Sequence, residues 1–284
     1  MRIGTRGSAL ALAQARQAVA LLPGEHELVE IVTTGDRGGV AANAITDKER
    51  WVRELDAALL DGRIDAAVHS AKDVPAELPD GITIAAVPPR ADPRDALCGA
   101  PGLGALREGA RVGTASLRRA AQLRALRPDL EVVELRGNVD SRLRKLAVGE
   151  ADAIVLAAAG LARLGRGGEG VAMDELVPAS GQGCLALTTR TGEELLVAGA
   201  RDDEAERALL AERAFVRALR ADCETPVGAY AKVAGTGLFL TAFAGAEDGS
   251  AWVRDELDGD EPEALGGEVA RRLLAAGANE VLGR

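Results

Sequence analysis

Cysteine, histidine and aromatic residues are scarce in this chain of 284 residues. Its three cysteines, Cys98, Cys184 and Cys223, are an odd number, which fits reduced thiols better than a disulfide framework. With only His26 and His69 present, we expect no metal site built on histidine. Aromatic residues make up 2% of the chain and its net charge is -10, whereas nucleic acids select basic surfaces and stacking rings. We therefore expect no nucleic-acid partner.

Long apolar runs and export signals are missing as well. No run approaches the length of a membrane span, and the N-terminus leads straight into strand-like sequence. We expect no membrane contact and a cytoplasmic location. The motifs GxxxxGK[ST], HExxH, CxxC and GxSxG are absent, and no GxGxxG directly follows a predicted strand. Nucleotide hydrolysis, dinucleotide redox, zinc-protease and serine-hydrolase chemistry thereby lose their main support.

Two pairs of similar segments occur in the same order along the chain. "RIGTRGSAL" from Arg2 matches "RVGTASLRR" from Arg111, and "GRIDAAVHSAKD" from Gly62 matches "GEADAIVLAAAG" from Gly149. Each member of the first pair predicts a strand, a Gly-Thr turn and a serine that caps the N-terminus of a helix. Chance similarity between strands of small residues is the alternative. The repeats predict two α/β domains of similar plan.

Alternation of predicted strands and helices divides the chain into three domains. We expect residues 1–88 with about 179–200 to form a first α/β domain and residues 94–178 to form a second one, in a periplasmic-binding-protein-like arrangement. From residue 203 a helix, three antiparallel strands and a closing helix predict a smaller α+β domain over 203–284. The polar, glycine-containing segment 38–49 follows a strand, so we expect a mobile loop beside a site.

A basic segment contrasts with the acidic total. Residues 111–145 hold nine basic and four acidic side chains, so this window is about +5 and the remainder about -15. Arg118 and Arg119 fall in the first turn of a predicted helix, where cations are unfavourable by some tenths of a kcal/mol. A bound anion would offset this unfavourable interaction, and Thr114 and Ser116 would complete a binding site for a carboxylate or phosphate. A solvated surface position is the alternative for any one arginine.

Further candidates lie where predicted strands end, because such ends face the ligand crevice of an open α/β sheet. The strand "DAAVHS" delivers Ser70, Lys72 and Asp73 together, and a carboxylate there can stabilise a developing cation or move a proton. A surface ion pair between Lys72 and Asp73 is the alternative. The turns and strand ends of the two α/β domains add five more candidates, namely Arg6, Ser8, Arg136, Arg142 and Arg163.

Cys223 differs from the other two cysteines in its surroundings. It lies on a predicted loop between the helix and the first strand of the third domain, whereas Cys98 and Cys184 lie in apolar runs that predict core positions. A loop thiol is the more accessible one for chemistry. A purely structural thiol at Cys223 is the alternative.

Taken together, these residues resemble the porphobilinogen deaminase family, also called the hydroxymethylbilane synthases. The resemblance covers almost the whole chain in the order of the family's motifs: "TRGSALALAQA", "DAAVHSAKDVP", "DPRDAL", "VGTASLRRAAQL", "LRGNVDSRLRKL", "DAIVLAAAGLARLG", "GQG" and "CETPVGAYA". The family usually places glycines before this cysteine, whereas here Ala221 and Asp222 precede Cys223 and Glu224 follows it.

The resemblance implies a transferase that joins four porphobilinogen molecules head to tail, with loss of ammonia, to give hydroxymethylbilane for tetrapyrrole biosynthesis. It implies a dipyrromethane cofactor bound through a thioether to Cys223, and Asp73 as the catalytic carboxylate. Implied cofactor contacts are Ser70, Lys72, Thr114, Ser116, Arg118 and Arg119, and implied substrate contacts are Arg6, Ser8, Arg136, Arg142 and Arg163. We expect a monomer. The alternative function is a two-domain receptor that binds a carboxylate ligand without reacting.

Overall fold

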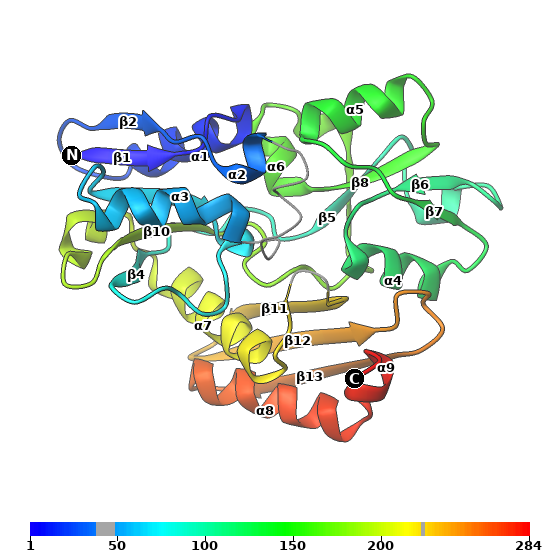
Figure 1. The fold of residues 1–284 in the computed structure, drawn as a ribbon. Helices are drawn as coiled ribbons and strands as arrows, with labels where there is room; N and C mark the ends of the chain where they lie inside the picture. The colour runs from blue at the N-terminus through cyan, green and yellow to red at the C-terminus, as the bar shows by residue number, and fades with distance from the viewer. Residues whose placement is uncertain (38–48, 223–224) are drawn as a thin grey trace.

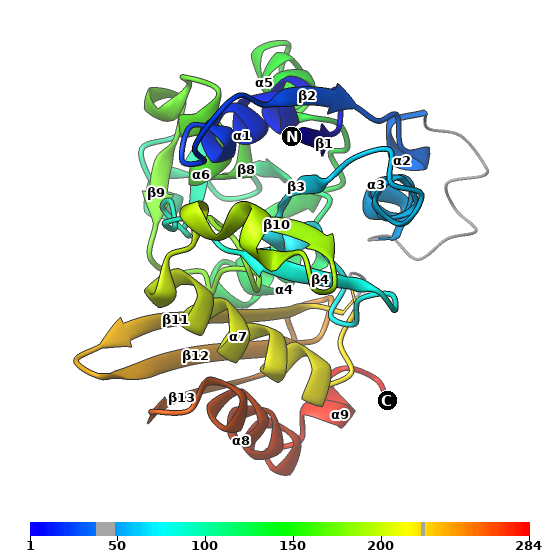
Figure 2. The same cartoon turned by 90° about the vertical axis from the view of Figure 1, so that its left-hand side faces the viewer.

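The computed structural model describes residues 1–37, 49–222 and 225–284. Within them the strands form two five-stranded sheets and one three-stranded sheet. The two larger sheets lie side by side, and the three-stranded sheet lies beneath both of them in Figure 1. Figure 2 gives the perpendicular view. The predicted fold class, two similar α/β units and a smaller C-terminal α+β unit, is confirmed.

The first sheet joins N-terminal strands to one strand from much later in the chain. Its elements are β1 (Arg2–Thr5), α1 (Ala9–Val19), β2 (Glu27–Glu30), α2 (Thr34–Arg37), α3 (Glu49–Leu60), β3 (Ala66–Ser70), the 3-10 turn η2 (Ala71–Asp73), β4 (Ile82–Ala86), β10 (Leu185–Arg190) and the 3-10 helix η5 (Glu194–Ala200). The strand order is β2-β1-β3-β10-β4, with β1 parallel to β2 and β3, and β10 antiparallel to β3 and β4.

The second sheet repeats this plan. Its elements are β5 (Asp95–Cys98), η3 (Leu103–Ala105), β6 (Arg111–Gly113), α4 (Leu117–Leu126), β7 (Glu131–Val133), α5 (Val139–Ala147), β8 (Ala153–Ala157), α6 (Ala158–Arg163), η4 (Gly167–Glu169) and β9 (Val171–Met173). In the order β7-β6-β8-β5-β9, three parallel strands again precede an antiparallel strand. The repeated segments therefore occupy equivalent places, since β1 corresponds to β6 and β3 corresponds to β8.

The Gly-Thr turns form the predicted helix starts. Ser8 precedes α1 and its side chain accepts a hydrogen bond from the Ala11 backbone N–H, while Ser116 precedes α4 and accepts one from the Arg119 N–H. Each capped helix begins beside the end of a central strand, β1 or β6. The residues in each turn are thereby held at the carboxyl-terminal ends of the parallel strands, where β3 and β8 also end.

The chain crosses between the two sheets twice, before β5 and again after β9. Because β10 follows the second unit in sequence yet pairs with β3 and β4, both crossings are needed to complete the first sheet. The limits assigned to the three domains remain a prediction. The loop predicted over residues 38–49 falls outside the described residues, apart from Glu49, where α3 begins.

The C-terminal unit is a three-stranded antiparallel sheet covered by helices. Its elements are α7 (Asp203–Ala218), β11 (Val227–Ala234), β12 (Gly237–Gly245), β13 (Trp252–Gly259), α8 (Pro262–Ala275) and α9 (Ala278–Val281). The core of this unit includes Phe215, Leu240 and Val269, each fully buried. In Figure 2, α7 begins just below β10 and runs diagonally across β11 and β12. The unit meets the rest of the molecule through α7 and also through its strands, since the Ala229 N–H donates to the Pro178 carbonyl and Phe243 of β12 packs on Ala121 of α4.

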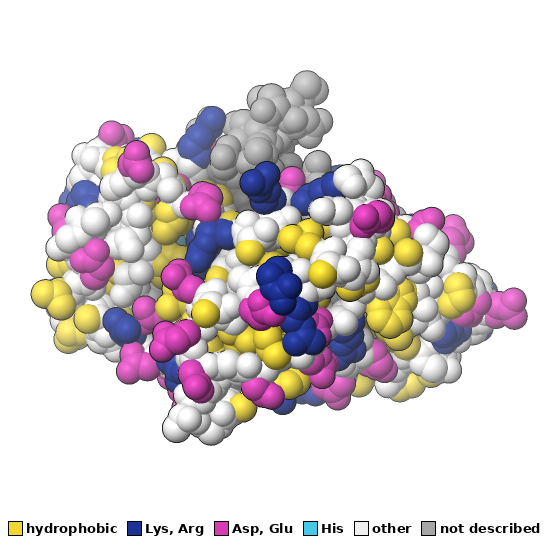
Figure 3. All heavy atoms as spheres, turned by 90° about the horizontal axis from the view of Figure 1, so that it is seen from below, with side chains coloured by type: hydrophobic (Ala, Val, Ile, Leu, Met, Phe, Trp, Pro, Cys, Tyr) yellow, Lys and Arg dark blue, Asp and Glu magenta, His cyan; other side chains and the backbone are white. Residues whose placement is uncertain are grey.

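The surface of the molecule carries charges of both signs. On the face shown in Figure 3, acidic and basic side chains are interspersed, and those drawn there do not gather into one broad basic surface. Among the described residues, no helix has both the length and the apolar character that crossing a membrane requires.

Candidate active site

The segment with Lys72 and Asp73 leaves β3 at Ser70 and makes the single 3-10 turn η2. The backbone N–H of Ala71 donates to the carbonyl of Cys184 at 3.1 Å. Gly181, at a φ of 73°, packs so closely on this turn that a Cβ there would lie 2.9 Å from the backbone nitrogen of Lys72. Only glycine fits such a conformation and contact without strain. The backbone of the turn is thus held against the loop that precedes β10.

Neither Lys72 nor Asp73 forms a side-chain hydrogen bond or salt bridge with another described residue, and both are partly buried. Burial lowers the pKa of Lys72 to about 8, with Asp73 opposing the shift and Arg119 adding to it. The ammonium group therefore lies in a desolvated environment that includes other cations. Both groups are placed to interact with a ligand.

Arg118 and Arg119 do converge, but on a carboxylate of the protein itself. Arg118 Nη1 donates to Asp95 Oδ2 at 2.7 Å, and Arg119 Nε donates to Asp95 Oδ1 at 2.9 Å. Asp95 is fully buried and the two arginines are 5% exposed. Burial alone would raise the pKa of Asp95, but the two guanidinium charges and hydrogen bonds from Arg118 and Gln182 hold it well below its usual range. The two arginines and Asp95 together carry a net charge of about +1.

Sequence reasoning assigned these arginines to a ligand and missed Asp95 altogether. The available signal was an acidic residue in the first position of a buried strand, in the segment "DPRDAL". Buried charges are paired or they shift their ionisation, so a carboxylate there implies a cationic partner. Asp95 therefore supplies part of the negative charge that we expected a ligand to bring to the start of this helix. Arg118 retains a buried Nε without a hydrogen-bond partner among the described residues.

Arg142 lies among cations without an acidic partner. It is partly buried, and its Nε is buried without a hydrogen-bond partner in the described structure. Burial, together with the charges of Arg119 and Arg136, lowers its pKa to about 10. Lys72 and Arg142 are thus both coupled electrostatically to Arg119. These charges favour binding of a polyanionic ligand at this place.

The remaining arginine candidates have other partners. Arg163 bridges the two larger units, since its Nη2 donates to the Gly183 carbonyl at 2.8 Å and its Nε donates to Gln17 Oε1 at 3.1 Å. Arg6 donates from Nε to Asp36 at 3.2 Å and lies 4.0 Å over the ring of Trp51. Arg136 is exposed and pairs with Glu134. The structure brings Lys72, Arg118, Arg119 and Arg142 together, whereas Arg6 is held by Asp36.

The hydroxyl candidates are used within the fold. Ser70 Oγ accepts from Gln14 Nε2 at 2.7 Å, and Thr114 Oγ1 accepts from the Ser116 N–H at 3.1 Å. Ser8 and Ser116 cap α1 and α4. These four side chains shape the turns at the sheet edges, and this leaves fewer of their lone pairs and protons for a ligand.

Cys223, the candidate anchor, lies outside the described residues. The described residues that flank it contact each other, because the Asp222 N–H donates to Thr225 Oγ1 at 3.1 Å and that hydroxyl donates to Asp222 Oδ1 at 2.6 Å. The other thiols are core residues, as predicted: Cys98 and Cys184 are at most 1% exposed. Burial raises the pKa of Cys98 to about 11 and that of Cys184 to about 12. Neither is suited to act as a nucleophilic thiolate.

Two α/β units of the same strand plan, with desolvated cations such as Lys72 and Arg142 near one another, are typical of the class of proteins whose site favours an anionic ligand. The comparisons with known proteins identify the family. The family described as "Porphobilinogen deaminase, dipyromethane cofactor binding domain" matches residues 1–198, and "Porphobilinogen deaminase, C-terminal domain" matches residues 206–275. The chain belongs to the porphobilinogen deaminase family.

Curated relatives agree over nearly their full length. The porphobilinogen deaminase of Rubrobacter xylanophilus is 49% identical, covering 99% of this chain and 96% of the relative. That of Roseiflexus sp. (strain RS-1) is 50% identical, covering 99% and 97%. Among solved structures, a periplasmic substrate-binding protein of an ABC transporter from Coxiella burnetii is 14% identical, with a TM-score of 0.42, covering 72% of this chain and 92% of that one.

The activity is that of the family. The chain is a transferase that condenses four porphobilinogen molecules into hydroxymethylbilane, with release of ammonia, in tetrapyrrole biosynthesis, and its cofactor is dipyrromethane. The alternative, a receptor that binds a carboxylate ligand without reacting, is not favoured, because both family matches together span the chain from the first unit to the third.

Proposed function

We propose that Asp73 is the catalytic carboxylate and that the cations around it bind the carboxylates of cofactor and substrate. The observation that carries this proposal is the contrast between Asp73 and Asp95. Asp95 is fully buried and engaged by two arginines, whereas Asp73, the neighbour of Lys72 in the chain, has no hydrogen-bond partner among the described residues. A carboxylate left open in this way can stabilise the positive charge that develops on a pyrrole as ammonia leaves, or accept a proton from it.

The residues present fit the dipyrromethane cofactor. Each of its rings carries carboxylate side chains, and the site holds the Lys72 ammonium and two buried Nε atoms, of Arg118 and Arg142, that lack partners among the described residues. When bound through a thioether to Cys223, the cofactor supplies the pyrrole end to which substrate units are joined. Lys72, Arg118 and Arg119, with Ser70, Thr114 and Ser116 shaping the turns around them, would hold it.

Substrate binding is assigned to the arginines at the edges of the two larger sheets. Arg142 and Arg163 lack carboxylate partners among the described residues, so each can take a carboxylate without giving one up. Arg136 would exchange Glu134 for the ligand, and Arg6, in the turn capped by Ser8, would leave Asp36. An exposed pair such as Arg136 with Glu134 is weak and exchanges readily. We further propose a monomeric, cytoplasmic enzyme without a nucleic-acid partner, which size-exclusion chromatography and localisation would test.

The proposal is tested by Asp73→Asn, which keeps the shape of the side chain and removes its charge. Mass spectrometry first establishes that the variant carries a dipyrromethane adduct. We then expect kcat to fall on the order of 10²- to 10³-fold with KM little changed, because the lost interaction is made in the transition state. Asp80→Asn, an exposed carboxylate seven positions along the chain, is the matched control and keeps full activity. Unaltered kcat in the cofactor-loaded Asp73→Asn enzyme would refute the role.

A further inference from the structure

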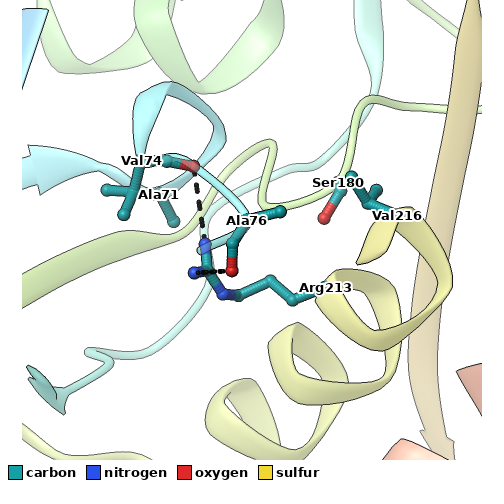
Figure 4. Close-up of a pocket in the computed structure, with 6 residues that line it drawn as sticks. All are labelled: Ala71, Val74, Ala76, Ser180, Arg213 and Val216. Carbon is teal, nitrogen blue, oxygen red and sulfur yellow. Dashed lines mark hydrogen bonds between the residues drawn. The ribbon is translucent and has the colours of Figure 1, made fainter. Parts of the chain in front are cut away.

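A buried arginine of the C-terminal unit binds the segment that follows Asp73. Arg213 lies on α7 and is 7% exposed. Its Nη2 donates to the carbonyls of Pro75 at 2.7 Å and Ala76 at 2.9 Å, and its Nη1 approaches the carbonyl of Val74 at 3.4 Å. In Figure 4 the guanidinium lies at the edge of a small cavity and points toward this segment. None of its hydrogen-bond partners is a carboxylate.

A buried guanidinium without a carboxylate is costly, which is reflected in its pKa. Burial, together with the charge of Arg217, lowers the pKa of Arg213 to about 10. An apolar side chain at this place on α7 would avoid that cost. The three carbonyl contacts are what the buried guanidinium gains instead, and all three belong to consecutive residues that immediately follow Asp73 in the chain.

Apart from Arg213, the segment is held by apolar packing and one short turn: Val74 is buried in a cluster with Leu209 of α7, and Ala76 packs against the core of the C-terminal unit. Val74 N–H donates to the Ala71 carbonyl at 3.2 Å, which closes one 3-10 turn, and Pro75 has no N–H to donate. On the upstream side the turn is held by Cys184 and packed by Gly181, as described above. On the downstream side, the hydrogen bonds that the carbonyls of residues 74–76 accept within the described structure all come from Arg213.

The residue before Arg213 fixes the same helix to the other side of the turn. Glu212 is fully buried and binds Arg90 Nη1 at 2.6 Å and the N–H of Gly181 at 2.6 Å. Two neighbouring residues of α7 thus hold the segments on both sides of η2. The helix ends at Ala218, and Cys223 follows five positions later. A continuous helix therefore links these contacts to the start of the loop that bears the proposed anchor.

We propose that Arg213 is a positioning residue that orients Asp73 by fixing the carbonyls of residues 74–76. The inference rests on the proposed catalytic role of Asp73. A planar guanidinium presents several N–H groups in a fixed fork, so it can engage neighbouring carbonyls at once, which a lysine ammonium does with less geometric definition. Displacing a reacting group by about 1 Å can reduce turnover by about 10²-fold.

The first test measures Arg213→Met, which keeps the aliphatic stem, and Arg213→Lys, which keeps the charge. The matched control is Arg217→Met, one turn along the same helix, whose guanidinium pairs instead with Glu263 at 3.1 Å. Kinetics are measured per molecule that carries the dipyrromethane adduct by mass. We expect kcat of Arg213→Met to fall about 10- to 100-fold with KM little changed, Arg213→Lys to be intermediate, and Arg217→Met to be unaltered. Should the methionine variant fail to fold, the lysine variant carries the same comparison.

The second test separates positioning from stability and from the role of Asp73. In an Asp73→Asn background, Arg213→Lys and Arg213→Met should produce little further loss of kcat, because a residue that acts through Asp73 has nothing left to position. Normal kcat in both Arg213 variants would overturn the inference. So would a loss of kcat that is equally large in the unaltered and the Asp73→Asn backgrounds. If Asp73→Asn alone keeps full turnover, the proposed catalytic role fails first. If Asp73→Asn is impaired but the Arg213 variants are not, only the positioning role fails.

Discussion

Replacing Asp95 by asparagine would remove the carboxylate that two buried guanidinium groups share. Arg118 Nη1 and Arg119 Nη2 each lie 2.7 Å from one of its oxygens, and the side chain has no exposed surface. Breaking a buried ion pair by removing one partner costs about 3–5 kcal/mol, because the remaining charge stays buried and uncompensated. Asparagine would also turn an NH₂ group toward N–H donors. We therefore expect the free energy of unfolding to fall by at least about 3 kcal/mol.

The assay is urea unfolding followed by circular dichroism, with Asp129→Asn as the control. Asp129 forms an ion pair with Arg127 at 2.6 Å in the same unit, but both side chains are partly open to solvent, so its loss should shift the midpoint far less. Equal midpoints for the two variants would refute the argument that Asp95 neutralises a desolvated pair of cations.

The pH dependence of this difference has a definite sign. The pKa of Asp95 is depressed in the folded state, so its contribution is fully present above the unfolded value of about 3.9 and is lost as pH falls through the folded value. The difference in unfolding free energy between the unaltered protein and Asp95→Asn should therefore stay constant from about pH 6 to 8 and shrink only in acid. A difference that changes across neutral pH would point to another group.

Two further predictions concern the cations that lack a carboxylate partner. Because burial lowers the pKa of Lys72 to about 8, its charge is lost above that pH, so kcat/KM of the unaltered enzyme should decline on the alkaline side. Lys72→Met should have a lower kcat/KM at neutral pH and should lack this decline. An unchanged alkaline decline in the variant would assign the titration to another group. For Arg142→Leu, removal of a desolvated cation beside Arg119 should leave Tm unchanged or higher while KM rises about tenfold or more, equivalent to about 1.4 kcal/mol of binding; an unaltered KM would contradict the assignment.

Much of the fold follows from local pattern. The Gly-Thr turns with Ser8 and Ser116 as caps were predictable, because an N-cap is a contact between neighbours in sequence. The repeated segments identified corresponding strands in two sheets, since similar patterns of apolar and small residues form similar units. The core positions of Cys98 and Cys184 followed from their apolar neighbours.

The ion pairs that decide the charge of the site did not follow from the sequence. Arg118 meets Asp95 across 23 positions, and Arg90 meets Glu212 across 122, so no local charge count detects them. Such pairs depend on which strands lie side by side. Arg213 was missed for the same reason: its partners are backbone carbonyls 137 to 139 positions away, and carbonyls carry no signal in the sequence.

The distribution of these pairs explains how an acidic protein keeps a cationic site. Asp95 offsets one of the two adjacent arginines, so the turn can fold before any ligand is present. Lys72 and Arg142 are left without carboxylate partners in the described structure, and their lowered pKa values record the cost of holding them there. A ligand carboxylate removes that cost by restoring the missing opposite charge, so part of the binding free energy comes from relief of repulsion within the protein. On the proposed assignment, a fully paired set of cations would be more stable but would bind the carboxylates of cofactor and substrate less strongly.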